Sequence, residues 1–184
     1  KKIENIIREE INNIGGEELL MPSLQPKEIY NQTDIGPEDK EGWGRMREAM
    51  YQVKDKTGRE IGFGSTHEEV AVDIAKKFIN SYKDLPVYIY QFQNKFRQEK
   101  RAKSGIIRTR EFIMKDLYSL NRTEEEFRAF YEQCAEAYMK IFIRAGIGER
   151  TYRSFASGGS FSKFSDEFQT VCQAGEDTIY IDKK

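Results

Sequence analysis

The segment FRQEKRAKSGIIRTREFIMKD, from Phe96 to Asp116, decides the fold of this chain. It joins two apolar runs, Val87 to Gln98 and Ile106 to Leu120, whose length and alternation predict the arms of one long antiparallel hairpin. The loop between the arms contains Gly105 and is rich in basic residues. The cationic side chains are Arg97, Lys100, Arg101, Lys103, Arg108, Arg110 and Lys115, with Glu99 and Glu111 set among them. This composition predicts a site that binds a polyanion.

Strand alternation predicts which of these side chains act together, since residues two apart share a face. Arg97 and Glu99 are expected on one face of the first arm. Arg108, Arg110 and Phe112 are expected on one face of the second arm. Guanidinium groups bind phosphate through paired hydrogen bonds, a carboxylate accepts from an amine, and an aromatic ring stacks on a nucleobase, so the pattern favours a purine nucleotide. The alternative is a hairpin whose exposed loop is basic without binding anything.

Composition limits the remaining possibilities. The 184 residues carry a formal net charge of -1, which argues against a uniformly basic nucleic-acid-binding surface and favours a local patch. Cys134 and Cys172 form no CxxC pair and His67 is the single histidine, so no metal site is predicted. Such cysteine usage is typical of a reducing, cytoplasmic compartment. The sequence has neither an apolar run of about 18 residues nor a signal-type amino terminus, so we expect one main soluble domain without a membrane segment.

Helices and further strands are expected on both sides of the hairpin. Helical periodicity predicts helices over residues 1–14, from a Thr66 to Glu69 capping signature to about Leu85, and from a Thr123 to Glu126 capping signature to Arg144. An edge strand that ends at Pro22 is expected in the run over residues 17–26. Further strands are expected in a hairpin over 50–64 and over 151–155, 167–172 and 178–181, with a surface loop over 29–43. Strand and helix do not alternate regularly, so the predicted class is α+β, an antiparallel β-sheet flanked by helices.

The Thr66-His67-Glu68 segment is a second candidate site. A capping box explains Thr66 and Glu69 without any function, but it leaves Glu68 available. A carboxylate at a helix start, together with a threonine hydroxyl, is suited to hold a cationic amine. His67 receives no role, because the sequence offers it neither a nucleophile nor a metal partner. The glycine pair within Ser157 to Ser160 predicts a turn.

FRQE at 96–99, the basic loop and REF at 110–112 together resemble motif 2 of the class II aminoacyl-tRNA synthetases, here about residues 94–120. Further segments follow in the same order: GGEELLMPSLQP resembles the end of motif 1 (residues 17–26), GSTHEEV a proline-recognition segment (64–70), and SDEFQTVCQAGEDTIYI the approach to an editing insertion (157–184). Nearly the whole chain is similar to bacterial-type prolyl-tRNA synthetases. The resemblance implies the class II catalytic-core fold.

The resemblance implies an ATP site on the hairpin. Arg97 would contact the α-phosphate of ATP and the substrate carboxylate, which makes it the implied catalytic residue. Glu99 would bind the adenine amino group, and Phe112 would stack on adenine. Arg108 or Arg110 would help to hold the phosphates, and both are included in the implied ATP-binding set. ATP is expected to enter as a substrate together with Mg2+.

The resemblance also implies a proline site and a tRNA contact. Thr66 and Glu68 would grip the prolyl nitrogen, and the implied proline-binding set is Thr66, Glu68, Arg97, Met114 and Tyr118. Arg101 and Lys103 in the loop would meet the acceptor end of tRNA(Pro). The implied reaction activates L-proline to prolyl-adenylate and transfers the prolyl group to tRNA(Pro). The parent enzyme is expected to be a homodimer joined through motif 1.

The chain departs from the family pattern at single positions and by absence. Ala102 stands where the family usually has proline, and Asn121 and Asp166 stand where it usually has histidine. Motif 3, the editing insertion and the anticodon-binding domain do not occur in this sequence, so we expect a catalytic-core fragment that does not aminoacylate tRNA by itself. Open alternatives are another class II synthetase, for threonine or serine, and a noncatalytic nucleotide- or tRNA-binding relative. The Thr66-x-Glu68 pair favours proline, because a secondary amine needs a different cradle.

Overall fold

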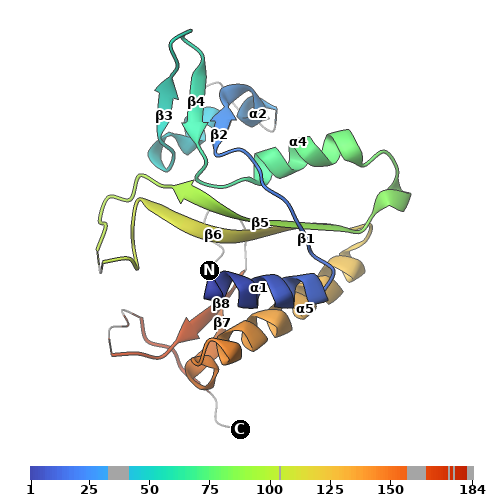
Figure 1. Ribbon diagram of the computed structural model, residues 1–184, viewed down its shortest axis with the longest axis vertical. Helices are drawn as coiled ribbons and strands as arrows, with labels where there is room; N and C mark the ends of the chain where they lie inside the picture. The colour runs from blue at the N-terminus through green and yellow to red at the C-terminus, as the bar shows by residue number, and fades with distance from the viewer. Residues whose placement is uncertain (33–41, 104, 157–164, 174, 176, 182–184) are drawn as a thin grey trace. The chain divides into compact units, whose positions relative to one another are not determined.

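The computed structural model describes residues 1–32, 42–103, 105–156, 165–173, 175 and 177–181 (Figure 1). The chain divides into two compact units, one from Gly15 to Phe127 and one that combines Lys1–Ile14 with Arg128–Lys184. Both units contain helices and antiparallel strand pairs, so the predicted α+β class is confirmed. Among the described helices, none is long and apolar enough to cross a lipid bilayer.

The larger sheet of the Gly15–Phe127 unit is built on the predicted hairpin. Strands β5 (Val87–Phe96) and β6 (Glu111–Leu120) pair antiparallel along their full lengths. The short β1 (Glu17–Glu18) adds to β5 in parallel. Figure 1 shows the two long strands curving side by side, with the basic loop at one end. The hairpin prediction is therefore confirmed in its main feature.

The second arm of the hairpin is shorter than predicted, because residues 106–110 belong to the loop. Gly105 turns the backbone with a φ of +62°, and the loop closes on itself through one isolated bridge between Lys103 and Arg108. Ile106 and Ile107 are 93% and 80% exposed. Neither isoleucine buries its side chain, so nothing stabilises a strand there, and alternation alone misplaced the start of β6.

A smaller sheet in the same unit has the strand order β2-β4-β3 and is antiparallel. Its β3 (Gln52–Lys54) and β4 (Glu60–Phe63) form the hairpin predicted over residues 50–64. β2 (Leu24–Pro26) follows the strand that was expected to end at Pro22, and it was not predicted as a separate strand. The chain leaves the larger sheet after β1 and joins the smaller one at β2. Pro22 lies between them and lacks the amide hydrogen that a continuous ladder needs.

Helix α4 (Glu68–Phe78) packs on the larger sheet. The contact is a buried apolar cluster whose members are Met21, Val70, Ala71 and Ile89. The helix ends at Phe78, before the predicted end at Leu85. Residues Tyr82–Asp84 form a separate 3-10 turn, η3, because Ser81 and Asp84 supply a capping box that starts a new element.

The described ends of the predicted surface loop over residues 29–43 are part of a core. Here lie α2 (Lys27–Asn31), α3 (Gly42–Arg45) and the 3-10 turn η2 (Met46–Glu48). They contribute to a buried cluster formed by Tyr30, Trp43, Met46 and Met50. The rings of Tyr30 and Trp43 are 5.6 Å apart. Burial of these aromatic side chains outweighed the polar composition on which the loop prediction rested; residues 33–41 lie outside the described residues.

The other unit contains α1 (Lys2–Asn13), most of α5 (Glu124–Arg144), the 3-10 turn η4 (Gly148–Arg150) and the antiparallel pair β7 (Thr151–Ala156) and β8 (Ser165–Thr170). Ion pairs from Arg144 to Glu9 and Glu10 join α5 to α1. Arg153 of β7 lies 2.5 Å from Asp166 and 2.6 Å from Glu132. Asp166, where a histidine was expected from the family pattern, thus has a structural partner. The strand predicted over 178–181 is wrong, because those residues join no ladder among the described strands.

Candidate functional site

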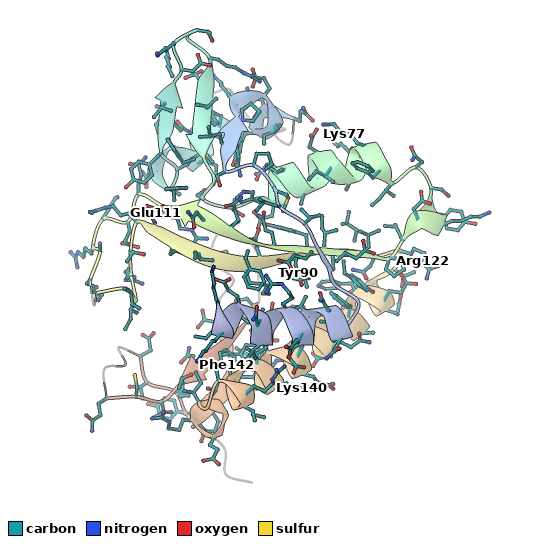
Figure 2. The ribbon with its side chains drawn as sticks, viewed as in Figure 1. Lys77, Tyr90, Glu111, Arg122, Lys140 and Phe142 are labelled. Atoms are coloured by element: carbon teal, nitrogen blue, oxygen red, sulfur yellow. The ribbon has the colours of Figure 1, made fainter. Side chains whose placement is uncertain are left out.

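One face of the β5–β6 hairpin carries much of the predicted site. Directly opposed residues of an antiparallel pair share a face, as do alternate residues along each strand. From the loop inward, the pairs on this face are Lys95 with Phe112, Gln93 with Met114, Gln91 with Asp116 and Ile89 with Tyr118. Glu111 marks the loop end of the hairpin and Arg122 the far end (Figure 2). The predicted residues Phe112, Met114 and Tyr118 therefore share a face with polar residues for which no role was predicted.

Arg97 lies directly after β5, at the open end of this face. Its amide donates to the carbonyl of Arg110 at 2.9 Å, which continues the hairpin ladder by one residue. Its guanidinium carbon is 5.4 Å from the centre of the Phe112 ring, and its Nε donates to the carbonyl of Ser65 at 3.2 Å. The contact with Ser65 brings Arg97 to the segment that begins at Thr66. The structure thus joins the two candidate sites that the sequence left separate.

Glu99 is placed by the loop and not by strand alternation, because β5 ends at Phe96. The Glu99 carboxylate accepts from the amide of Arg101 at 3.1 Å and lies 3.9 Å from Nε of Arg108. The carbonyl of Glu99 accepts from Nε of Arg110 at 3.0 Å. Glu99, Arg108 and Arg110 therefore do lie together, although the face-sharing argument that grouped Arg97 with Glu99 does not apply.

The tip of the loop is exposed. Arg101 and Lys103 both face solvent, and the backbones of Lys103 and Arg108 exchange hydrogen bonds of 3.1 and 3.3 Å. The loop therefore carries exposed cationic side chains together with two exposed isoleucines, Ile106 and Ile107. Such an exposed basic surface suits a large anionic partner better than a small ligand that needs an enclosed pocket.

The Thr66–Glu68 segment corrects the capping prediction. His67, not Thr66, is the N-cap residue of α4, and no side chain makes the cap hydrogen bond. The Thr66 hydroxyl donates to the Glu68 carboxylate instead. The helix therefore begins one residue later than the capping signature indicated. The hydroxyl and the carboxylate form a pair at the surface, since Glu68 is exposed and Thr66 is half-buried.

A network of buried polar groups lies behind this pair, and the sequence did not predict it. Lys95 is fully buried, with Nζ 2.8 Å from Oδ1 of Asp116 and 2.5 Å from Nδ1 of His67. Burial lowers the pKa of Lys95, and the hydrogen bond to Asp116 opposes that shift. The Tyr118 hydroxyl donates to Asp116 at 2.6 Å, and burial raises the pKa of Tyr118.

Side-chain amides connect the network to the segment that enters β2. Gln91 accepts from the amide of Met21 at 2.9 Å and donates to Asp116 at 3.0 Å. Gln93 donates to the carbonyl of Met21 at 2.7 Å. Gln25 donates to the carbonyl of Thr66 at 2.9 Å and accepts from the Tyr30 hydroxyl. The sequence analysis assigned no role to Gln91, Gln93 or Lys95, and only the tertiary contacts reveal the network.

The arrangement combines what an anionic nucleotide and a cationic amine each need. Arginine guanidinium groups and an aromatic ring lie at the loop end, and the Thr66–Glu68 pair lies next to the contact made by Arg97. Within the described residues, no group of three or more histidine, cysteine, aspartate or glutamate side chains is arranged to hold a metal ion.

Comparison with known proteins supports the resemblance to class II aminoacyl-tRNA synthetases that the sequence motifs indicated. The family model described as "tRNA synthetase class II core domain (G, H, P, S and T)" matches residues 51–179. The proline–tRNA ligase of Prochlorococcus marinus (strain MIT 9211) is 44% identical over 184 residues, which is 100% of this chain and 30% of that protein. A proline–tRNA ligase of Dehalococcoides mccartyi (strain ATCC BAA-2266 / KCTC 15142 / 195) is 44% identical over 179 residues, or 97% of this chain and 30% of that protein.

The fold has a solved counterpart. The Giardia lamblia prolyl-tRNA synthetase in complex with prolyl-adenylate matches with a TM-score of 0.71 and 18% sequence identity, covering 85% of this chain and 31% of that chain. At this identity the match shows the fold alone. The chain spans about 30% of the length of the curated relatives named above.

Proposed function

Because the chain belongs to the class II tRNA synthetase core domain family, we propose that it is the catalytic-core part of a proline–tRNA ligase, which activates L-proline with ATP and transfers it to tRNA(Pro). The contact between Arg97 and the carbonyl of Ser65 supports this most strongly. It sets a phosphate-binding guanidinium beside the Thr66–Glu68 pair, so a nucleotide and an amino acid would meet there. The relatives named as proline–tRNA ligases favour proline over threonine or serine.

The ATP half of the proposed site lies at the loop end of the hairpin. Arg97 would bind the α-phosphate, with Arg108 and Arg110 on the other phosphates, since guanidinium forks match phosphate oxygens. Phe112 would stack on adenine and Glu99 would accept from its amino group. Mg2+ would enter bound to the ATP phosphates, which commonly serve as its ligands together with water. None of the residue roles proposed here depends on a metal ion bound by this chain.

The proline half would use the Thr66–Glu68 pair. The Glu68 carboxylate and Thr66 hydroxyl would hold the prolyl ammonium group, and Met114 and Tyr118 would form walls for the ring. A proline carboxylate oxygen would then attack the α-phosphorus of ATP, the bond to the bridging oxygen would break, and pyrophosphate would leave with the electron pair. Arg97 would stabilise the charge that develops on the α-phosphate oxygens.

Transfer would complete the reaction. A hydroxyl of the terminal ribose of tRNA(Pro) would attack the prolyl carbonyl carbon, lose its proton, and displace AMP. Arg101 and Lys103 on the exposed loop would bind the acceptor end of the tRNA. We further propose that residues 17–26, 64–70 and 94–120 are the end of motif 1, the proline-recognition segment and motif 2, that residues 157–184 approach an editing insertion, and that the protein acts in the cytoplasm as a homodimer.

Binding of a non-hydrolysable prolyl-adenylate analogue, measured by calorimetry, tests the proposal. We expect Arg97→Ala and Glu68→Gln each to weaken binding by at least about tenfold, because each removes a charge-assisted contact. Lys77→Ala is the matched control, since Lys77 lies on α4 and pairs with Asp73 of the same helix (Figure 2). Equal binding of threonyl and seryl analogues would contradict the assignment to proline.

A further inference from the structure

The imidazole of His67 is buried and has a partner on each ring nitrogen. Nε2 lies 3.1 Å from the carbonyl oxygen of Pro22, and Nδ1 lies 2.5 Å from Nζ of Lys95. A carbonyl only accepts a hydrogen bond and an ammonium only donates one. These partners therefore require a neutral imidazole that carries its hydrogen on Nε2.

The same residue is tied to the hairpin a second time, through its backbone. The amide of His67 donates to the Tyr118 hydroxyl at 3.1 Å, and that hydroxyl donates to Asp116 at 2.6 Å. Asp116 in turn lies 2.8 Å from Lys95, which returns to the His67 ring. These residues form a closed ring of contacts that fixes both the side chain and the backbone of His67.

The ring holds the segment that carries the proposed proline contacts. His67 stands between Thr66 and Glu68, and the carbonyl of Thr66 is held by Gln25 at 2.9 Å. The backbone at Gly64 passes so close to the His67 imidazole that a Cβ on Gly64 would lie 2.7 Å from Cε1 of His67. The Thr66 hydroxyl donates to the Glu68 carboxylate, and neither group is a member of the closed set of contacts around His67. Anchoring at residue 67 therefore leaves the two neighbouring side chains available for a ligand.

We propose that His67 is a positioning residue for the amino acid substrate: through Lys95, Asp116 and Tyr118 it fixes Thr66 and Glu68 at the spacing that grips the prolyl nitrogen. This inference rests on the proposed function, because it takes proline as the ligand of that pair. It assigns a role to a side chain that contacts neither ATP nor proline. Any buried neutral histidine needs a partner on each nitrogen, but here Lys95 at the His67 ring and Tyr118 at the His67 amide both lead to the same carboxylate, Asp116.

Separate KM values for proline and ATP, measured by pyrophosphate exchange in the natural gene product, test this role. His67→Leu removes both ring contacts, and we expect the KM for proline to rise at least about tenfold while the KM for ATP changes less than about twofold. His67→Asn keeps an acceptor near the position of Nδ1 and should recover part of the loss. Lys77→Ala should match the unsubstituted protein in both constants.

An unchanged KM for proline in His67→Leu overturns the inference, and so does an equal rise for proline and ATP, which general loosening of the fold would produce. Thr66→Val and Glu68→Gln distinguish this failure from failure of the proposed function. If neither of these two variants weakens proline binding, the amino acid site itself is misassigned. If both weaken it and His67→Leu does not, only the role of His67 fails.

Nuclear magnetic resonance tests the geometry without any activity, because His67 is the single histidine of the chain. A long-range 1H–15N correlation spectrum of the 15N-labelled protein reports the tautomer directly. We expect a neutral Nε2–H imidazole at pH 7, and a changed Nδ1 shift when Lys95→Met removes the donor. An Nδ1–H tautomer, or an Nδ1 shift unaffected by Lys95→Met, overturns the inference even if the His67→Leu variant fails to fold.

Discussion

At the scale of single residues, the burial of the Lys95 ammonium carries the clearest free-energy cost. A fully buried ammonium is tolerated only when its charge is matched, and Asp116 at 2.8 Å provides that match. His67 and Tyr118 complete the hydrogen bonding around the pair. Because burial lowers the pKa of Lys95, the site favours loss of its proton unless the carboxylate is present. Stability at this point thus depends on both charges together.

A double-mutant cycle tests that dependence. Lys95→Met and Asp116→Leu should each lower the free energy of unfolding by about 3–5 kcal/mol, because each leaves one buried charge without its partner. The double variant should lose clearly less than the sum, since it leaves no unmatched charge. Urea unfolding followed by circular dichroism measures all four proteins. Strict additivity would show that the two charges do not interact.

His67 gives the protein a defined response to acid. Burial, and then the neighbouring Lys95 charge, lower the pKa of His67 from 6.5 to about 4. Between these values the unfolded chain takes up a proton that the folded chain refuses, so stability is present above about pH 6.5 and is lost as the pH falls toward 4. We expect this group to account for up to about 3 kcal/mol of that loss. Urea unfolding at pH 7.5 and 4.5 should show a smaller difference for His67→Leu than for the unsubstituted protein; parallel losses would exclude the effect.

At the scale of elements, local patterns predicted what local interactions decide. α1 and β5 were confirmed close to their expected bounds, and β6 at its end but not at its start, because alternation and helical periodicity are properties of adjacent residues. The early end of α4 followed from the Ser81 and Asp84 capping box, which the sequence contains but which was not recognised. Burial of Lys95 could not be predicted, since its partners lie 21 and 28 positions away along the chain.

The basic loop has its own test at this scale. Arg101→Ala and Lys103→Ala should each weaken tRNA binding about equally for all sequences, and should lower the slope of log affinity against log salt by about one unit. Binding of the prolyl-adenylate analogue should not change, because both side chains are exposed on the loop. Ile106→Ser in the same loop alters no charge and is the control for the slope, which filter binding at several salt concentrations measures. An unchanged slope in both basic variants would remove the loop from the tRNA contact.

At the scale of the whole molecule, the candidate residues are confined to one of the two compact units. The ATP, proline and tRNA contacts proposed here all lie between Thr66 and Tyr118, inside the Gly15–Phe127 unit. The other unit has its own stabilising pairs, of which the contacts of Arg153 with Glu132 and Asp166 are the clearest. The residues proposed to bind ligands therefore differ from the residues whose ion pairs stabilise the other unit.

This division predicts separable effects. Arg153→Met should lower the midpoint of thermal unfolding by a few degrees, because it removes the partner of two carboxylates, although pairs this exposed contribute only about 1 kcal/mol each. It should leave the affinity for the prolyl-adenylate analogue within about twofold of the unsubstituted protein. Scanning calorimetry and titration calorimetry give the two quantities. A large loss of affinity would show that the site depends on residues outside its own unit.

The bond from Arg97 to Ser65 also has a consequence for drug resistance. The acceptor is a main-chain carbonyl, so no codon change at position 65 removes it directly. The Ser65 side chain is buried, and its hydroxyl has no partner among the described residues, which makes Ser65→Ala the mildest available change and one that leaves the carbonyl in place. An inhibitor that relied on this guanidinium orientation would therefore keep the supporting bond through substitutions of Ser65, and the direct way to remove that bond is a substitution of Arg97 itself.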